Sequence, residues 1–190
     1  MDIVLDCAAY QTPEHLDNLL KNAPDNIVAV YVKATQGLNY TDASAASLVA
    51  VCQKHNTPHA YYDFMTNDQM IAQEKFYTEF IHGLPPSTLK MMLDAEGSYN
   101  RWLAGVEHFE YALGSEPLLY AQLSNMSKYQ GGKLLRWVAQ YDSMSYYRPQ
   151  QSEIDSYKQQ GYVLWQFTDS YLGSSQDASV LLASMNDLRI

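Results

Sequence analysis

Short apolar segments alternate with helical patterns along the first two thirds of this 190-residue chain, and this alternation limits its possible folds most strongly. Strands that alternate with helices form a mostly parallel sheet, because each helix returns the chain to the same end of the sheet. With about eight strands, such a sheet is expected to close into a barrel. The apolar segments expected as strands are 3–5, 27–32, 59–64, 89–96, 117–120, 134–141 and 162–167.

The segments between these strands carry helix signals. Thr12 and Pro13 predict a helix start, and Asp42 is a candidate N-cap for a helix that ends near His55. Asp177 is expected in a polar loop, followed by a short apolar helix around 180–182. Further helices are expected over 68–82, 103–113 and, weakly, 152–160. A full (β/α)8 barrel typically has about 250 residues, so the sequence predicts an α/β fold, an irregular (β/α) TIM-like barrel with a reduced number of helices, as one domain over 1–190.

Composition excludes several functional classes. A net charge of -9 argues against nucleic-acid binding, which needs clustered Lys and Arg. No segment has the apolar length of a membrane helix, so no membrane insertion is expected. Cys7 and Cys52 lack metal-ligand spacing and the histidines are scattered, so neither a metal nor a cofactor is predicted. The N-terminus enters a strand pattern without a signal peptide, which predicts synthesis in the cytoplasm.

Two acids end the expected strand 89–96. In Leu93-Asp94-Ala95-Glu96, alternate side chains share one face, so Asp94 and Glu96 are expected about 7 Å apart along the strand. Two carboxylates so close do not ionise independently in a partly dry site, and one is expected to keep its proton to higher pH. The alternative is that the strand ends there and both acids are solvated loop residues.

Charged residues also lie at or after the ends of several other expected strands. In a parallel barrel these ends meet at one mouth, where such barrels place their catalytic groups. Carboxylates and aromatic rings are the equipment of a glycosidase, in which one acid protonates the leaving oxygen and another stabilises the sugar cation or positions a nucleophile. The charged residues expected at this mouth are Asp6, Lys33, Asp63, Asp94, Glu96 and Asp177.

These residues and their neighbours resemble glycoside hydrolase family 25, the Chalaropsis-type lysozymes or N-acetylmuramidases, many of them phage endolysins. The similarity covers nearly the whole chain, with its elements in the family's order. The matching elements are Asp6 with Tyr10-Gln11, 32–37, Tyr61-Tyr62, 93–96, Leu119-Tyr120, 137–141, 165–168, and Gly173 before Asp177.

The resemblance implies an enzyme that cleaves the β-1,4 bond between N-acetylmuramic acid and N-acetylglucosamine. It implies that Glu96 is the general acid, that Asp94 assists it, and that Asp6 and Asp177 complete the acidic floor. Retention and inversion both remain open. The residues expected to bind substrate are Lys33, Tyr61, Tyr62, Tyr120, Trp137 and Gln166, with a place in the core as the alternative for Trp137. Asp63 has no counterpart in the family's pattern.

The partner implied is bacterial peptidoglycan. The resemblance implies a phage or prophage lysin that acts on the cell wall after release by a separate holin-type partner, as a monomer without a wall-binding domain of its own. One alternative is a catalytically inactive glycan-binding module on the same barrel. Another is an unrelated barrel hydrolase that acts on a different polysaccharide.

Overall fold

Nine strands form one closed sheet in the computed structural model, which describes residues 1–96, 115–129, 134–141 and 147–190. The strands run in the order β1-β9-β8-β7-β6-β5-β4-β2-β3, and β1 also pairs with β2. Eight strands therefore form a ring, and β3 extends it as a short antiparallel partner of β2. The strands are β1 Asp2–Cys7, β2 Asn26–Gln36, β3 Tyr40–Thr41, β4 His59–Phe64, β5 Met92–Asp94, β6 Leu118–Gln122, β7 Leu135–Ala139, β8 Leu164–Thr168 and β9 Asp177–Leu181.

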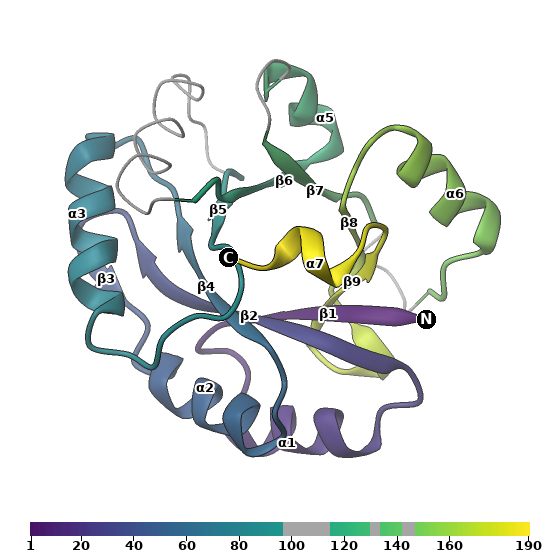
Figure 1. Cartoon of the computed structure of the whole chain (residues 1–190), viewed down its shortest axis with the longest axis horizontal. Coiled ribbons are helices and arrows are strands. Elements are labelled where there is room, and N and C mark those ends of the chain that lie inside the picture. Colours follow the sequence, from purple (N-terminus) through teal and green to yellow (C-terminus); the bar gives the residue numbers. More distant parts are fainter. Residues whose placement is uncertain (97–114, 130–133, 142–146) are drawn as a thin grey trace.

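Few helices surround this ring, as Figure 1 shows. Three of them, α1, α2 and α3, cover the half of the barrel built from the N-terminal part of the chain. The helices are α1 Pro13–Asn22, α2 Ala45–Lys54, α3 Met70–Ile81, α5 Leu123–Met126, α6 Gln151–Gln159 and α7 Met185–Leu188, with 3-10 turns η1 Ser127–Tyr129 and η2 Tyr171–Gly173. The predicted irregular barrel with few helices is confirmed, and the helix expected over 103–113 lies outside the described residues.

The start of α1 follows its sequence signal, and the start of α2 does not. Thr12 caps α1 by accepting a hydrogen bond from the His15 N–H at 3.1 Å. Asp42 is not the N-cap of α2, because a turn from Asp42 to Ala45 holds it outside the helix and Ser44 occupies the cap position. The Asp42 carboxylate accepts hydrogen bonds from the N–H groups of Ser44 and Ala9, each at 2.8 Å. It therefore ties the loop after β1 to the loop before α2.

The prediction for the C-terminal segment was wrong. Residues 177–181 form β9, which runs antiparallel to both β1 and β8 and closes the ring between them. A short apolar run fits a strand and a helix equally well by periodicity. Here it forms a strand because the edges of β1 and β8 would otherwise be left unpaired. Asp177 is the first residue of this strand and lies directly opposite Asp6.

Alternation along the strands divides the core into two layers. One layer fills the barrel and includes Tyr31, Tyr62 and Trp137. The other lies between the barrel and its helices and includes Leu48 and Tyr77. The two faces of each strand therefore enter different environments, and the inward face leads up to the mouth.

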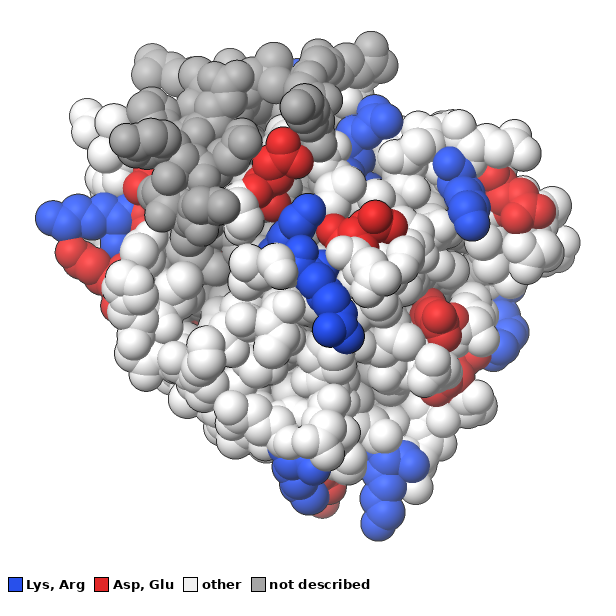
Figure 2. Space-filling model, viewed as in Figure 1, with Lys and Arg blue, Asp and Glu red and all other residues white. Residues whose placement is uncertain are grey.

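Helix α7 covers the end of the barrel where the parallel strands begin. Leu188 packs into the interior layer, and its carbonyl oxygen accepts a hydrogen bond from the Lys90 N–H at 2.8 Å. Figure 1 shows α7 lying across the centre of the ring. On this face acidic and basic side chains are interspersed among uncharged ones (Figure 2).

Candidate active site

The carboxyl ends of the parallel strands bring several acids to one mouth of the barrel. Asp6 lies near the end of β1 and Asp94 ends β5, and both point along the inward face. Because β9 runs the opposite way, its first residue, Asp177, lies at the same mouth and pairs with Asp6. The structure therefore brings the predicted acidic residues together, with Glu96 two residues beyond the end of β5.

The main chain holds the end of β5 firmly between its neighbours. The Asp94 carbonyl oxygen accepts from the Met65 N–H at 2.9 Å, and the Ala95 N–H donates to the Tyr120 carbonyl oxygen at 2.8 Å. The Glu96 N–H donates to Oδ1 of Asp94 at 3.3 Å. Asp94 is buried and Glu96 is half-buried, so the pair differs in its access to water.

Burial raises the pKa of Asp6, Asp94, Glu96 and Asp177, and repulsion from neighbouring acids adds to this effect for all of them except Glu96. For Asp6, burial raises the pKa first, followed by the charges of Asp177, Asp94 and Glu96. For Asp94, burial and the charge of Glu96 raise the pKa, and Lys33 opposes them. Burial raises the pKa of Glu96, opposed by the Tyr120 hydroxyl and by Lys33. The mouth is thus suited to hold at least one neutral carboxyl near neutral pH.

The pKa of Asp177 is also raised. Burial, then the charges of Asp169 and Glu96, raises its pKa to about 6, while a hydrogen bond from Gln166 opposes the change. Acids with unequal burial titrate at different pH values, which is the arrangement that assigns separate acid and base roles.

Two predicted binding residues, Lys33 and Tyr62, lie side by side at the mouth on paired strands. Lys33 Nζ donates to Oε1 of Gln36 at 2.7 Å and lies 4.7 Å from the ring centroid of Phe64. Burial lowers the pKa of Lys33, and the charge of Asp94 is the largest opposing influence. Tyr62 is buried, and burial together with the charges of Asp6 and Asp94 raises its pKa.

Tyr120 and Gln166 also lie at the mouth, among the acids. The Tyr120 hydroxyl is 3.2 Å from Oε1 of Glu96 and hydrogen-bonds to Oε1 of Gln166. The Gln166 side-chain amide donates to Oδ1 of Asp177 at 2.8 Å. A continuous row of polar groups therefore joins β5, β6, β8 and β9.

Trp137 and Tyr61 do not reach this mouth. Trp137 is fully buried inside the barrel, where its indole N–H donates to Oγ of Ser179 at 2.8 Å. Tyr61 neighbours Tyr62 in sequence and so faces the other side of β4, where its hydroxyl donates to the Pro85 carbonyl oxygen at 2.7 Å. Both side chains support the barrel from positions away from the cleft.

Asp63 also points away from the mouth. It lies on the outward face of β4, where Oδ1 accepts a hydrogen bond from the Thr35 hydroxyl at 2.6 Å and Oδ2 is buried with no hydrogen-bond partner among the described residues. Burial raises the pKa of Asp63 to about 7. The expectation that Asp63 lies with the other charged residues at the mouth was therefore wrong, because period-two alternation turns it to the opposite face of β4 from Tyr62.

Sequence reasoning missed Tyr141 as a residue of this mouth. Tyr141 follows β7 and is half-buried, and burial together with the charges of Asp177 and Glu96 raises its pKa. The signal available was its place two residues after a strand end, inside the matched element 137–141.

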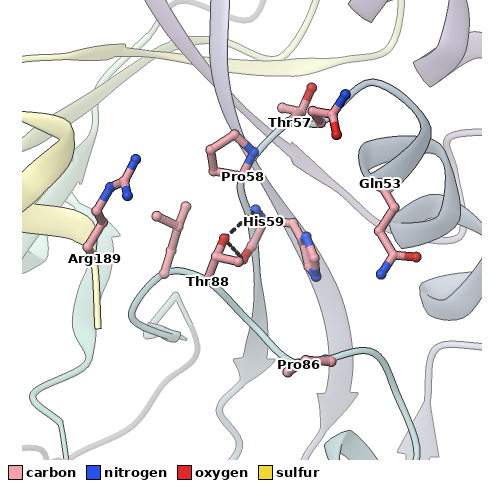
Figure 3. Close-up of a pocket in the computed structure, with 9 residues that line it drawn as sticks. Gln53, Thr57, Pro58, His59, Pro86, Thr88 and Arg189 are labelled. Atoms are coloured by element: carbon pink, nitrogen blue, oxygen red, sulfur yellow. Dashed lines mark hydrogen bonds between the residues drawn. The ribbon is translucent and has the colours of Figure 1, made fainter.

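A separate pocket of about 520 Å³ lies at the other end of the barrel. In Figure 3 its lining comes from the start of β4, from the segment before β5 and from the chain after α7, and hydrogen bonds join Thr88 to the main chain of His59. Its described lining contains no carboxylate, so it lacks the groups needed for acid catalysis of glycoside cleavage. The lining residues are Gln53, Asn56, Thr57, Pro58, His59, Pro86, Thr88, Leu89 and Arg189.

Comparison with protein families identifies this arrangement. The sequence matches Glycosyl hydrolases family 25 over residues 6–175. The chain belongs to this family. It is therefore a glycoside hydrolase, and the matched region contains Asp6, Asp94 and Glu96 but ends two residues before Asp177. No match is found among curated proteins.

Solved structures with the same fold come from fungi, from bacteria and from a bacteriophage. The muramidase from Acremonium alcalophilum is 18% identical, with a TM-score of 0.72 over 100% of this chain and 97% of that one. The family GH25 lysozyme from Aspergillus fumigatus is 21% identical, with a TM-score of 0.72 over 97% and 95%. The catalytic domain of endolysin ply40 from bacteriophage P40 of Listeria monocytogenes is 19% identical, with a TM-score of 0.71 over 95% and 93%.

Two further observations concern only the part of the chain that the structure describes. None of its helices is both long and apolar enough to cross a membrane. No group of three or more His, Cys, Asp or Glu side chains within those residues is arranged to hold a metal ion.

Proposed function

We propose that this protein is a peptidoglycan hydrolase, an N-acetylmuramidase that cleaves the β-1,4 bond between N-acetylmuramic acid and N-acetylglucosamine. The observation that carries the proposal is the cluster of Asp6, Asp94, Glu96 and Asp177 at the mouth of a family 25 barrel. A glycan strand is uncharged along its sugar backbone, so its cleavage depends on acid groups at the scissile bond.

Glu96 is the general acid in this proposal. It is the less buried member of the Asp94–Glu96 pair, so it can reach the glycosidic oxygen, and burial raises its pKa, so it keeps its proton to higher pH than a solvated Glu does. Its proton passes to the leaving oxygen as the bond to the anomeric carbon breaks. Asp94 assists by accepting a hydrogen bond from the Glu96 N–H and by presenting negative charge to the sugar cation.

The other residues of the mouth bind substrate or complete its floor. Lys33 and Tyr62 face the cleft from paired strands and offer hydrogen-bond donors to sugar hydroxyl and acetamido groups. Asp6 and Asp177 close the floor beneath the reacting sugar. Tyr61 and Trp137 are left out of the proposed binding set, since the Tyr61 hydroxyl bonds the Pro85 carbonyl oxygen and Trp137 is fully buried against Tyr31.

The experiment that tests this function is digestion of purified peptidoglycan, reduction with borohydride and identification of the released fragments by mass spectrometry. Reduced N-acetylmuramic acid ends are the expected result. Reduced N-acetylglucosamine ends would refute the proposed bond. Co-sedimentation with the wall without new reducing ends would favour the glycan-binding module instead, and cleavage of chitin alone would favour a hydrolase of another polysaccharide.

We also propose the narrower role of a lysin that acts after release from the cytoplasm. The likeness to the endolysin catalytic domain supports it, although fungal enzymes have the same fold. Bacteria that produce the protein without a leader are expected to grow normally and to lyse when their membrane is permeabilised. Cells that produce the Glu96→Gln variant are the control and are expected to stay intact. Survival of permeabilised cells that contain the parent enzyme would refute this role.

A further inference from the structure

Four side chains form one row of hydrogen-bonding groups across the mouth of the barrel. The Tyr120 hydroxyl lies 3.2 Å from Oε1 of Glu96 and also contacts Oε1 of Gln166. The Gln166 amide nitrogen is 2.8 Å from Oδ1 of Asp177. Tyr120 is 5% exposed and Gln166 is 1% exposed, so water has little access to the middle of the row.

The number of protons in this row limits how it can be arranged. A tyrosine hydroxyl carries one proton, and two acceptor oxygens face the hydroxyl of Tyr120. Because the NH₂ group of Gln166 is turned toward Asp177, only its carbonyl oxygen faces Tyr120. That oxygen cannot donate, so it competes with the Glu96 carboxylate for the single tyrosine proton. When Tyr120 donates to Gln166, the contact between Glu96 and Tyr120 requires a proton from Glu96.

We propose that Gln166 is a positioning residue that sets the direction of this row, so that Glu96 keeps its proton while Asp177 keeps its charge. The amide does this because it presents an acceptor to one side and a donor to the other. The use of that proton in glycoside cleavage rests on the proposed function, whereas the distribution of protons in the row does not. The reverse amide orientation would require a protonated Asp177.

Other charged and titratable groups also face the two acids. Those facing Glu96 include Asp94 on β5, Lys33 on β2, Asp6 on β1 and Tyr141 after β7, and Asp169 faces Asp177. They influence both acids through charge and burial. None of them joins Glu96 to Asp177 by hydrogen bonds among the described residues, so the effect of Gln166 is separable from theirs.

The test is substitution of Gln166 by Met, which has a similar length and neither donor nor acceptor of comparable strength. Without the amide oxygen, the Tyr120 proton turns to the Glu96 carboxylate, and the pKa of Glu96 falls by about one unit. Without the amide N–H, Asp177 loses a donor to its charged form, and its pKa rises by about one unit. The two acids therefore shift in opposite directions.

The measurement is a titration of carboxyl carbon-13 signals by NMR on the full chain, with Glu96 and Asp177 assigned from the Glu96→Gln and Asp177→Asn variants. Opposite shifts support the proposal. A purely structural role for Gln166 would admit water and lower both pKa values together, since burial raises both. Parallel shifts, unchanged values, or a rise for Glu96 with a fall for Asp177 would overturn the proposal.

Two further variants sharpen the test. Gln166→Met added to Tyr120→Phe should leave the pKa of Glu96 where Tyr120→Phe puts it, because the connecting hydroxyl is gone. Gln73→Met is the matched control, since Gln73 is also buried but bonds Thr66 and Asp68 instead. It should move neither pKa.

Enzyme kinetics separate this inference from the proposed function. In Gln166→Met, the basic limb of the pH profile of kcat/KM should move to lower pH by about one unit, following Glu96. A basic limb that stays in place despite the NMR shift would overturn the link to catalysis. If the parent releases no reducing ends, the proposed function fails, and the NMR titration still decides the proton distribution.

Discussion

Substitution of Trp137 by Phe distinguishes a core residue from a substrate-binding one. Trp137 is fully buried, its ring centroid is 5.0 Å from that of Tyr31 and 5.7 Å from that of Tyr120, and its N–H bonds the buried Ser179. The smaller ring leaves about 40 Å³ empty, which costs about 1 kcal/mol. The Ser179 hydroxyl loses its partner, which adds about 1–2 kcal/mol.

The free energy of unfolding of the variant should therefore fall by about 2–3 kcal/mol. For a domain of this size, Tm should drop by about 5–10 °C. Differential scanning calorimetry measures this change, and co-sedimentation with peptidoglycan at a temperature well below Tm measures binding, which should stay unchanged. Removing both partners in Trp137→Phe/Ser179→Ala should recover about 1 kcal/mol. An unchanged Tm with weakened binding would refute the assignment of Trp137 to the core.

Two titration predictions follow from the charges on either side of the barrel wall. Burial raises the pKa of Asp63 from 3.8 to about 7, so the folded state binds this proton more tightly and stability falls as pH rises through that window. Asp63→Asn should remove this decline, giving a gain in Tm over the parent that grows from acid to neutral pH; a gain of equal size at all pH values would contradict it. Lys33 lowers the pKa of Asp94 and Glu96, so Lys33→Met should move both limbs of the pH profile of kcat/KM to higher pH, whereas the exposed Lys21→Met should not. Unmoved limbs in Lys33→Met would show that this charge does not act on the two acids.

The closed barrel was predictable because local patterns in the sequence mark its strands. Each apolar run between helix signals became a strand, and parallel pairing then placed Asp6, Asp94 and Glu96 at one end without any knowledge of packing. Tyr62 and Tyr120 followed by the same rule, since each lies on the inward face near a strand end.

The residues that sequence reasoning misplaced depend on long-range contacts. Strand β9 exists because β1 and β8 leave a gap that residues 177–181 fill, and no local pattern distinguishes such a short strand from a helix. Asp42 has a capping side chain, yet contacts with Ala9 and Ala34 fix its main chain outside α2.

A one-residue difference also separates the mouth from the outer layer. Tyr61 lies beside Tyr62 in sequence, but period-two alternation turns it toward the outside of the barrel. Trp137 does face inward, but it is fully buried, with its ring packed against those of Tyr31 and Tyr120. Depth along the barrel axis depends on strand register, which the sequence does not state.

The central claim is that Glu96 at this mouth is the general acid of a muramidase. The most direct measurement is the rate at which new reducing ends form on purified peptidoglycan, for the parent, for Glu96→Gln and for the exposed control Glu14→Gln. Loss of the proton donor should lower the rate by about 10²–10⁴-fold with Tm preserved, and the control should match the parent. A Glu96→Gln variant as active as the parent would contradict the claim.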